Sequence, residues 1–152
     1  MADYPNCTYH GCDIPYTIDQ NPMKDQLIFK HGNVVKGLPY EYNTFDFVHM
    51  RALIAALTKE EWPIVIKEIL HVTKPGGVVH CKNPTWKQLP EKSLVPFYKL
   101  VAAIHTACQA RDQNPEIALK LKDPVLENDN VEVLRVVTRS FSGSLYTKSI
   151  IE

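Results

Sequence analysis

Short apolar runs alternate along the chain with longer amphipathic stretches, and this alternation predicts a layered α/β fold. Four runs are typical of β-strands, at residues 8–12, 27–30, 45–50 and 78–81. Long connections separate them, so we expect these four strands to run parallel. Two further β-rich runs, at residues 131–140 and 144–151, are separated by Ser142-Gly143. This short connection predicts an antiparallel pair at the end of the chain.

The helical stretches lie between these runs. The clearest begins after Thr58, which forms a capping box with Glu61. Its apolar face is formed by residues at helical spacing, namely Trp62, Ile66, Ile69 and Leu70. The run Lys74-Pro75-Gly76-Gly77 is expected to end this helix in a turn. Two more helices are expected, over residues 93–111 and 115–126. No repeat or linker interrupts the pattern, so residues 1–152 are interpreted as a single domain.

The composition of the chain indicates which kinds of molecule it can bind. The chain has 17 Lys and Arg against 17 Asp and Glu, and this balance supplies no basic excess for nucleic acid. No apolar run is long enough to span a membrane, and the first residues do not resemble a secretory signal. We therefore expect a cytoplasmic protein with small-molecule or protein partners. The four cysteines (Cys7, Cys12, Cys81 and Cys108) form no Cys-x-x-Cys pair, so we expect reduced thiols and no metal site.

Three polar residues follow or occupy the predicted strands, and each has two interpretations. Asp13 is either a helix cap or solvated loop residue, or it holds ribose hydroxyls, because a carboxylate accepts two hydrogen bonds from a diol. Asn33 either bonds to its own backbone in a turn or faces an adenine edge. His49 is either a core histidine or a catalytic base. The residues taken singly leave these alternatives open.

One block of sequence is more specific than any single residue. It comprises Gly32-Asn33-Val34, Gly37-Leu38-Pro39-Tyr40 and Asn43 to Arg51, and it continues into the helix from Glu60 to Leu70 and the run Val72 to Gly77. This block resembles the class I S-adenosylmethionine-dependent methyltransferases. In that family, Leu-Pro-Phe/Tyr and Phe-Asp-Φ-Val precede a helix that ends near Lys-Pro-Gly-Gly. The resemblance extends over residues 3–151.

The resemblance implies a Rossmann-like, doubly wound sheet that binds S-adenosylmethionine at the carboxyl ends of its strands. Ribose would be held by Asp13 with its neighbour Ile14, and adenine would be flanked by Asn33 and Val34. The methionine end of the cofactor would be lined by His49, Met50 and Arg51. The methyl acceptor would enter over two loops, Arg51 to Ala55 and Asn83 to Trp86.

The family's glycine-rich loop (Asp/Glu-x-Gly-x-Gly-x-Gly) has no counterpart among the six glycines of this sequence. Met1 to Pro5 resembles the tail of the helix that follows that loop. We therefore expect a partial domain that lacks the first strand, which is central in the family's order 3-2-1-4-5-7-6. Without it, the runs at residues 8–12 and 45–50 lose a common neighbour. The consequence is a closed-up sheet, a loosened monomer or an edge-paired homo-oligomer, with a distorted methionine pocket.

Three functional hypotheses remain. The first is methyl transfer from S-adenosylmethionine to an unidentified acceptor, a small molecule or a protein, with activity impaired in this chain. The second is a degenerate, non-catalytic relative that acts by protein interaction. The third, another nucleotide-binding family, also needs a glycine-rich first turn and lacks the motif match. No residue is assigned as catalytic, and His49 is the only candidate for a general base.

Overall fold

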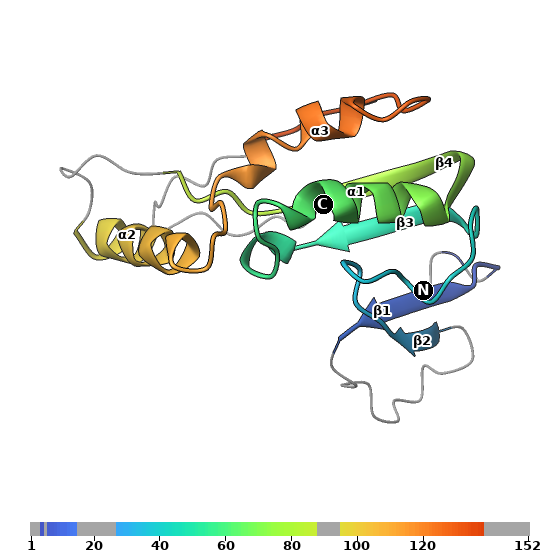
Figure 1. The fold of residues 1–152 in the computed structure, drawn as a ribbon, viewed down its shortest axis with the longest axis horizontal. Coiled ribbons are helices and arrows are strands. Elements are labelled where there is room, and N and C mark those ends of the chain that lie inside the picture. Colours follow the sequence, from blue (N-terminus) through green and yellow to red (C-terminus); the bar gives the residue numbers. More distant parts are fainter. Residues whose placement is uncertain (1–3, 5, 15–26, 88–94, 139–152) are drawn as a thin grey trace.

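A computed structural model describes residues 4, 6–14, 27–87 and 95–138 (Figure 1). Its strands are β1 (Tyr9–Asp13), β2 (Leu27–His31), β3 (Phe45–Arg51) and β4 (Thr73–Lys82). Its helices are α1 (Glu61–Val72), α2 (Val95–Gln109) and α3 (Lys122–Leu126), with short 3-10 turns η1 (Leu53–Ala55) and η2 (Ile117–Leu119). None of the helices that the structure describes is long and apolar enough to cross a membrane.

The four strands form two separate parallel pairs. β1 pairs with β2 from Tyr9↔Leu27 to Asp13↔His31, and β3 pairs with β4 up to Arg51↔Lys82. The predicted parallel pairings are therefore confirmed. The two pairs do not join into one sheet, because the strand orders are β1-β2 and β3-β4. The sequence analysis expected a closed-up sheet, in which β1 and β3 pair with each other, as one of three consequences of a missing central strand. This expectation is wrong for the described strands, because β1 and β3 lie in separate sheets.

α1 forms where the sequence predicted it and packs on β3 and β4. The predicted capping box is only half formed: Oε2 of Glu61 accepts the backbone N–H of Thr58 at 2.8 Å and its hydroxyl at 3.0 Å, whereas the helix begins after Glu60 and no side chain caps it. Pro63 lies in the first turn of α1, where its missing N–H has no helical partner to lose. The apolar stripe of α1 is buried, with Trp62 and Ile66 each only 1% exposed. The helix ends at Val72, and Thr73 continues directly into β4.

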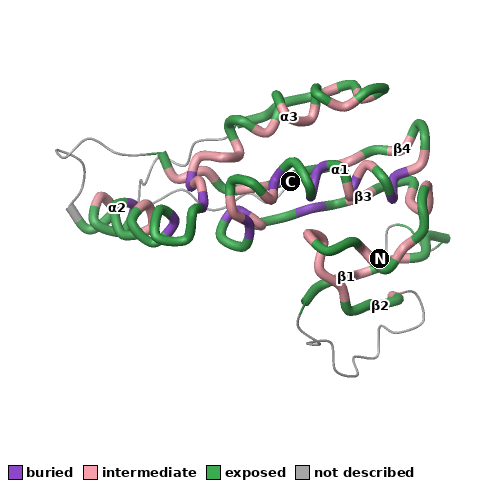
Figure 2. The backbone as a smooth tube through the Cα atoms, in the orientation of Figure 1, coloured by how far each residue is buried: buried purple, intermediate pink, exposed green. Residues whose placement is uncertain are grey.

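The hydrophobic core lies between α1 and the β3–β4 pair (Figure 2). It is built from residues of β3, the following loop and α1, namely Met50, Leu57, Trp62, Val65 and Ile69. Val48 and Val79 from the two strands pack against it, as do Ile117 and Leu121 from the region around η2. No residue of β1 or β2 is buried. The core therefore belongs to one half of the described structure.

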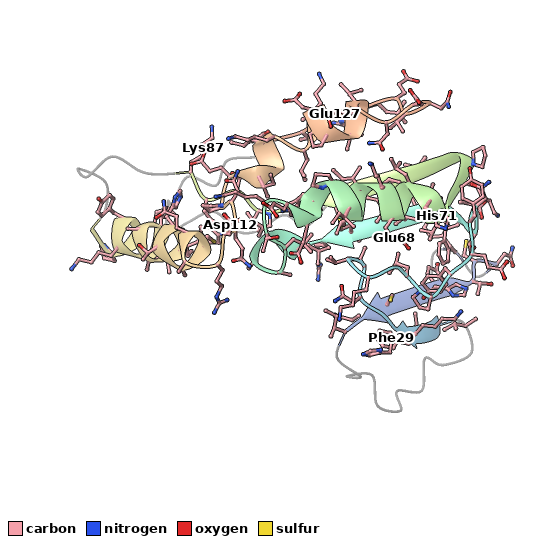
Figure 3. All side chains as sticks on the ribbon, in the orientation of Figure 1. Phe29, Glu68, His71, Lys87, Asp112 and Glu127 are labelled. Carbon is pink, nitrogen blue, oxygen red and sulfur yellow. The ribbon has the colours of Figure 1, made fainter. Side chains whose placement is uncertain are left out.

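The β1–β2 pair is attached to this core by the loop between β2 and β3. In that loop the N–H of Leu38 donates to the carboxylate of Glu68, which extends from α1, at 2.7 Å (Figure 3). The hydroxyl of Tyr40 donates to the carbonyl of Gly11 at 3.2 Å. The rings of His10, Tyr40 and Phe45 meet edge to face, with centroids 4.8–5.5 Å apart.

Two predicted elements are corrected. The run Lys74 to Gly77 is not a separate turn before the strand: it lies inside β4, which is bulged opposite Phe45 and Phe47, and Gly76 takes a φ of 77°. The predicted helix over residues 115–126 is divided into η2 and α3. Pro124 inside this region removes a backbone donor, which disfavours one continuous helix.

The predicted antiparallel pair at the end of the chain is not supported. Residues 131–138 are described and form no strand. Leu134 is 74% exposed and Val136 is 66% exposed, so no described residue buries this part of the run. The second run, residues 144–151, and Ser142-Gly143 lie outside the described residues. The helix expected over residues 93–111 is confirmed as α2 where it is described.

Candidate functional site

Asp13 ends β1, where its backbone and side chain shape the turn out of the strand. Its carbonyl accepts the N–H of Gly32 at 3.0 Å, beside the end of β2. Its carboxylate Oδ1 accepts the N–H of Ile14 at 2.7 Å. Both residues are exposed, Ile14 to 56%. Asp13 is therefore a solvated residue at the start of a loop, and one backbone bond leaves most of the accepting capacity of its carboxylate for a ligand, so the ribose-binding interpretation stays a prediction.

Asn33 follows β2 and makes the turn that its type favours. Its side-chain oxygen accepts the N–H of Val35 at 2.9 Å, and its backbone carbonyl accepts the N–H of Lys36 at 2.9 Å. The turn closes with a bridge from Asn33 to Gly37, whose φ is 103°. The turn-forming interpretation is therefore confirmed for the Asn33 oxygen. Val34 is half-buried and its side chain packs against the hydrophobic core. Its predicted position beside the adenine of the cofactor stays a prediction.

The end of β2 is closely packed, and Gly32 makes this possible. A Cβ added at Gly32 would lie 2.7 Å from Sγ of Cys12 and 2.7 Å from Cδ of Pro39. Lys30 covers the other side, donating to the carbonyl of Pro39 at 2.9 Å with its Nζ 4.8 Å from the centroid of the Tyr40 ring. Burial here raises the pKa of the Cys12 thiol above its usual range, which keeps it protonated.

The three candidate residues on β3 divide between the two faces of the strand. Met50 points into the core and is 6% exposed, so its side chain contributes to packing, and its role in lining the cofactor stays a prediction. His49 and Arg51 lie on the opposite face and are exposed, which also excludes the core-histidine interpretation of His49. The alternation of a strand makes such a division unavoidable for three consecutive residues.

His49 lies in a positively charged neighbourhood. Its ring is 4.9 Å from the ring of His80 on β4, measured between centroids. Partial burial lowers the pKa of His49, and the charges of His80, Arg51 and Lys82 lower it further. A lowered pKa favours the neutral imidazole at neutral pH, the protonation state that a general base requires.

The two predicted acceptor loops meet at the carboxyl ends of β3 and β4. The N–H of Leu53 donates to the side-chain oxygen of Asn83 at 3.0 Å, which ties the two loops together. Ala52 adopts a left-handed conformation (φ 58°), and its N–H donates to the carbonyl of Lys82 at 3.0 Å. Three buried polar groups have no hydrogen-bond partner among the described residues: the indole nitrogen of Trp62 in the core, and the amide nitrogen of Asn83 and the hydroxyl of Thr85 in this loop. Such groups are costly to leave unpaired, which makes the two in the loop candidates for ligand contact.

The structure thus groups the predicted residues at two places. Asp13, Ile14, Asn33 and Val34 lie together at the ends of β1 and β2, whereas His49 and Arg51 belong to the β3–β4 pair. Sequence reasoning assigned the loop from Asn83 to Trp86 only as a range. The unpaired polar atoms of Asn83 and Thr85 single out two residues within it. Sequence could not reveal them, because whether a polar group is satisfied depends on its three-dimensional neighbours.

Comparison with known protein families shows which family the chain belongs to. The family model described as a methyltransferase domain matches residues 1–81, which is more than half of the 152-residue chain. The chain therefore belongs to this methyltransferase domain family. The match includes all four described strands up to Cys81, and so it includes every candidate residue from Asp13 to Arg51.

Individual relatives are methyltransferases and a regulator. The chain is 36% identical over 75 residues to a demethylmenaquinone methyltransferase of Halalkalibacterium halodurans, covering 49% of this chain and 29% of that protein. It is 35% identical over 58 residues to the probable methyltransferase ltbC of Aspergillus luteorubrus, covering 38% of this chain and 20% of that protein. It is 27% identical over 81 residues to the secondary metabolism regulator laeA of Coprinopsis cinerea, covering 53% of this chain and 20% of that protein.

A solved structure is also similar to the chain. The crystal structure of the PH0226 protein from Pyrococcus horikoshii OT3 aligns with a TM-score of 0.48 and 22% sequence identity, covering 69% of this chain and 46% of that one. The matches to the three curated relatives each span less than a third of the relative's own length.

Proposed function

We propose that the domain to which this chain belongs transfers a methyl group from S-adenosylmethionine to a small-molecule or protein acceptor. We propose further that the domain is Rossmann-like with a doubly wound sheet, and that the protein is cytoplasmic. The family match over residues 1–81, with an exposed carboxylate at the end of β1, is the observation that carries this proposal. The chain by itself is proposed to bind the cofactor weakly.

The described residues fit the adenosine half of the cofactor better than its methionine half. Asp13 offers an exposed carboxylate at the carboxyl end of the β1–β2 pair, which is where parallel sheets bind ligands, and Asn33 follows the end of β2. The methionine half lacks equivalent support. The sequence contains no glycine-rich loop, and Met50 faces the core. Weak binding through the ribose and adenine is therefore the expected behaviour of the chain alone.

When bound, S-adenosylmethionine supplies an electrophilic methyl group on a sulfonium sulfur. The part of the protein is then mainly to position the groups and exclude water, worth up to about 7–11 kcal/mol in such reactions. Asp13 would hold the ribose hydroxyls. The unpaired donors of Asn83 and Thr85 would orient an acceptor carrying a hydrogen-bond acceptor atom. No side chain is assigned as the general base, although the lowered pKa of His49 makes its imidazole the group to test first.

Calorimetric titration with S-adenosylhomocysteine tests the cofactor proposal. Replacing Asp13 with Ala should weaken binding by about 1–3 kcal/mol, the usual cost of losing hydrogen bonds to a charged group. The matched control is Asp129→Ala, which removes an exposed carboxylate far along the chain and should leave the affinity unchanged. Equal affinity of the Asp13→Ala variant and the unaltered chain would show that Asp13 only shapes its own turn.

A second candidate function is a non-catalytic module that acts by protein interaction. The separation of the two sheets favours it, because β1 and β3 each keep an edge that no described strand pairs. This reading predicts homo-oligomers or partner complexes through these edges and no response to S-adenosylhomocysteine. Sedimentation of the purified chain with and without the ligand distinguishes the two functions.

A further inference from the structure

The loop between β2 and β3 begins with a closed turn, residues 33–37, which is called the Asn33 turn below. Its ends are joined by the bridge between Asn33 and Gly37, and the side-chain oxygen of Asn33 accepts the N–H of Val35 at 2.9 Å. This bond fixes the oxygen inside the turn. The amide nitrogen is then the side-chain group of Asn33 that can donate to an acceptor atom of a base. The position of the whole turn therefore decides where that donor lies.

The Asn33 turn rests on the core of the better-packed region. Val34 and Val35 are partly buried, and they pack against the hydrophobic cluster that α1 helps to build. By contrast, no residue of β2, the strand from which the turn extends, is buried. The buried side chains that support the turn therefore lie on the α1 side of it.

A hydrogen bond connects α1 to the end of the Asn33 turn. The carboxylate Oε1 of Glu68, a residue labelled in Figure 3, accepts the N–H of Leu38 at 2.7 Å, and Leu38 directly follows Gly37. The bond is partly buried and its acceptor is charged, and bonds of this kind are short and strong. Glu68 is itself held in place by its helix, because the next residue, Ile69, is only 4% exposed. A fixed helix thus holds the backbone where the turn closes.

We propose that Glu68 is a positioning residue for nucleoside binding: its carboxylate holds the Asn33 turn in the arrangement that receives the base, without touching the ligand itself. Binding groups need such supporting residues to stay in a productive geometry. The inference rests on the proposed function, because it takes the base to lie against Asn33 and Val34. Without the bond, the turn spends a smaller fraction of time in the binding arrangement, and the apparent affinity falls by that fraction.

A purely structural role for Glu68 predicts different behaviour. In that case, removing its carboxylate would lower the stability of the whole chain, and binding would be lost only as far as the chain unfolds. A positioning role is reciprocal, because a ligand that favours the held turn must also strengthen the contact that holds it. A bound nucleoside should therefore slow hydrogen exchange at the N–H of Leu38, and this response should depend on Glu68.

Two nucleosides separate the role of Glu68 from that of Asp13. The whole chain is titrated in NMR experiments with adenosine and with dideoxyadenosine, which keeps the base and lacks both ribose hydroxyls. Asp13→Ala should lower the affinity for adenosine to that for dideoxyadenosine, because Asp13 is proposed to hold those hydroxyls. Glu68→Ala should weaken binding of both nucleosides about tenfold and preserve the ratio of their affinities, because both carry the base.

Two further variants serve as matched controls. Glu68→Gln keeps a side-chain oxygen that can accept the N–H of Leu38, so it should recover most of the affinity that Glu68→Ala loses. Glu60→Ala removes an exposed carboxylate just before α1 and should change neither affinity. Urea unfolding should give nearly the same midpoint for all these variants. Adenosine should slow exchange at Leu38 in the unaltered chain and in Glu68→Gln, but not in Glu68→Ala.

The possible results distinguish failure of this inference from failure of the proposed function. If Asp13→Ala removes a preference for adenosine while Glu68→Ala binds like the unaltered chain, the positioning role is wrong and the adenosine site stands. If the unaltered chain shows no preference and Asp13→Ala changes nothing, the adenosine site is wrong, and the positioning role falls with it. A loss in Glu68→Ala that follows a lowered urea midpoint and that Glu68→Gln does not restore would assign Glu68 to fold stability alone.

Discussion

The β3–α1–β4 unit and the β1–β2 pair both consist of parallel strands, but they differ greatly in how well their side chains are packed. In the first, α1 covers one face of the strands and buries Trp62, Val65 and Ile66 almost completely. In the second, no strand residue is buried, and the described attachments include the Leu38–Glu68, Tyr40–Gly11 and Lys30–Pro39 hydrogen bonds and a group of three rings. Backbone pairing alone is weak support, since a two-stranded sheet without a packed face is at best marginally stable.

Because of this difference, the residues that stabilise the fold and those proposed to bind the ligand lie in different regions. The residues proposed to hold adenosine, Asp13 and Asn33, belong to the weakly packed pair, whereas the core that keeps the chain folded belongs to the other unit. Ligand-binding segments are commonly drawn from the less stable parts of a fold. We therefore expect mutations in the two regions to have separable effects, on global unfolding in one and on local opening in the other.

The largest effect is expected from Trp62→Ala in the well-packed unit. Trp62 is 1% exposed at the centre of the core, and truncating such a side chain costs about 3–5 kcal/mol. That is a large part of a typical stability of about 5–15 kcal/mol. Urea unfolding followed by circular dichroism measures the loss, with the exposed Ile64→Ala as control. A loss below about 1 kcal/mol would mean that α1 is not the centre of the core.

A smaller and more local effect is expected from Gly32→Ala at the end of β2. The added Cβ would lie 2.7 Å from both Cys12 and Pro39, so the strand end or the loop must shift. Overpacking of this kind costs about 1–3 kcal/mol. Hydrogen exchange should accelerate in β1 and β2 and remain unchanged in α1. Acceleration in α1 by the same factor would show that the two regions unfold together.

Glu68→Ala should release the attachment between the two regions. The N–H of Leu38 would lose its acceptor, at a cost of about 1–2 kcal/mol for a partly buried bond to a charged group. Exchange at Leu38 and along β1–β2 should increase, with little change in the urea midpoint of the whole chain. Glu60→Ala, which removes an exposed carboxylate before the same helix, is the control.

The smallest effect is expected from Asp46→Asn at the start of β3. The hydrogen bond from Lys74 lowers the pKa of Asp46 below its ordinary value of 3.8. A group whose pKa is lowered by folding stabilises the fold above its unfolded pKa, and this contribution is lost as pH falls through the folded one. The Asp46 side chain is 84% exposed and that of Lys74 is 42% exposed, so solvent screens the pair and the variant should unfold at nearly the same temperature at pH 7. Thermal melts between pH 2 and 7 check that the difference, where visible, disappears at the acid end.

The sequence predicted the elements whose signals are local. The capping residues and apolar stripe of α1 and the alternation of the first four strands were sufficient to place them and their parallel direction. The run at residues 131–138 has equally strong β character, yet it forms no strand. A strand needs a neighbour, and whether one is present is decided by contacts distant in sequence.

The sequence predicted where along the chain the candidate site residues lie, but it did not predict which way their side chains point or whether their polar atoms are paired. Asp13 and Asn33 lie at strand ends as expected, because apolar runs reveal where strands stop. The pattern around Phe45 to Arg51 could not decide which face the core occupies, and so Met50 was assigned to the cofactor although it is buried. The unpaired atoms of Asn83 and Thr85 have no sequence signal.

Hydrogen exchange resolved by mass spectrometry, with and without millimolar S-adenosylhomocysteine, tests the division between the two regions most directly. The structure predicts slow exchange in β3 and α1 and exchange faster by at least about an order of magnitude in β1 and β2. The ligand should slow exchange at residues 9–13 and 27–33 and leave α1 unchanged. Uniformly slow exchange in all four strands, with no response to the ligand at Asp13 or Asn33, would contradict both the division and the proposed site.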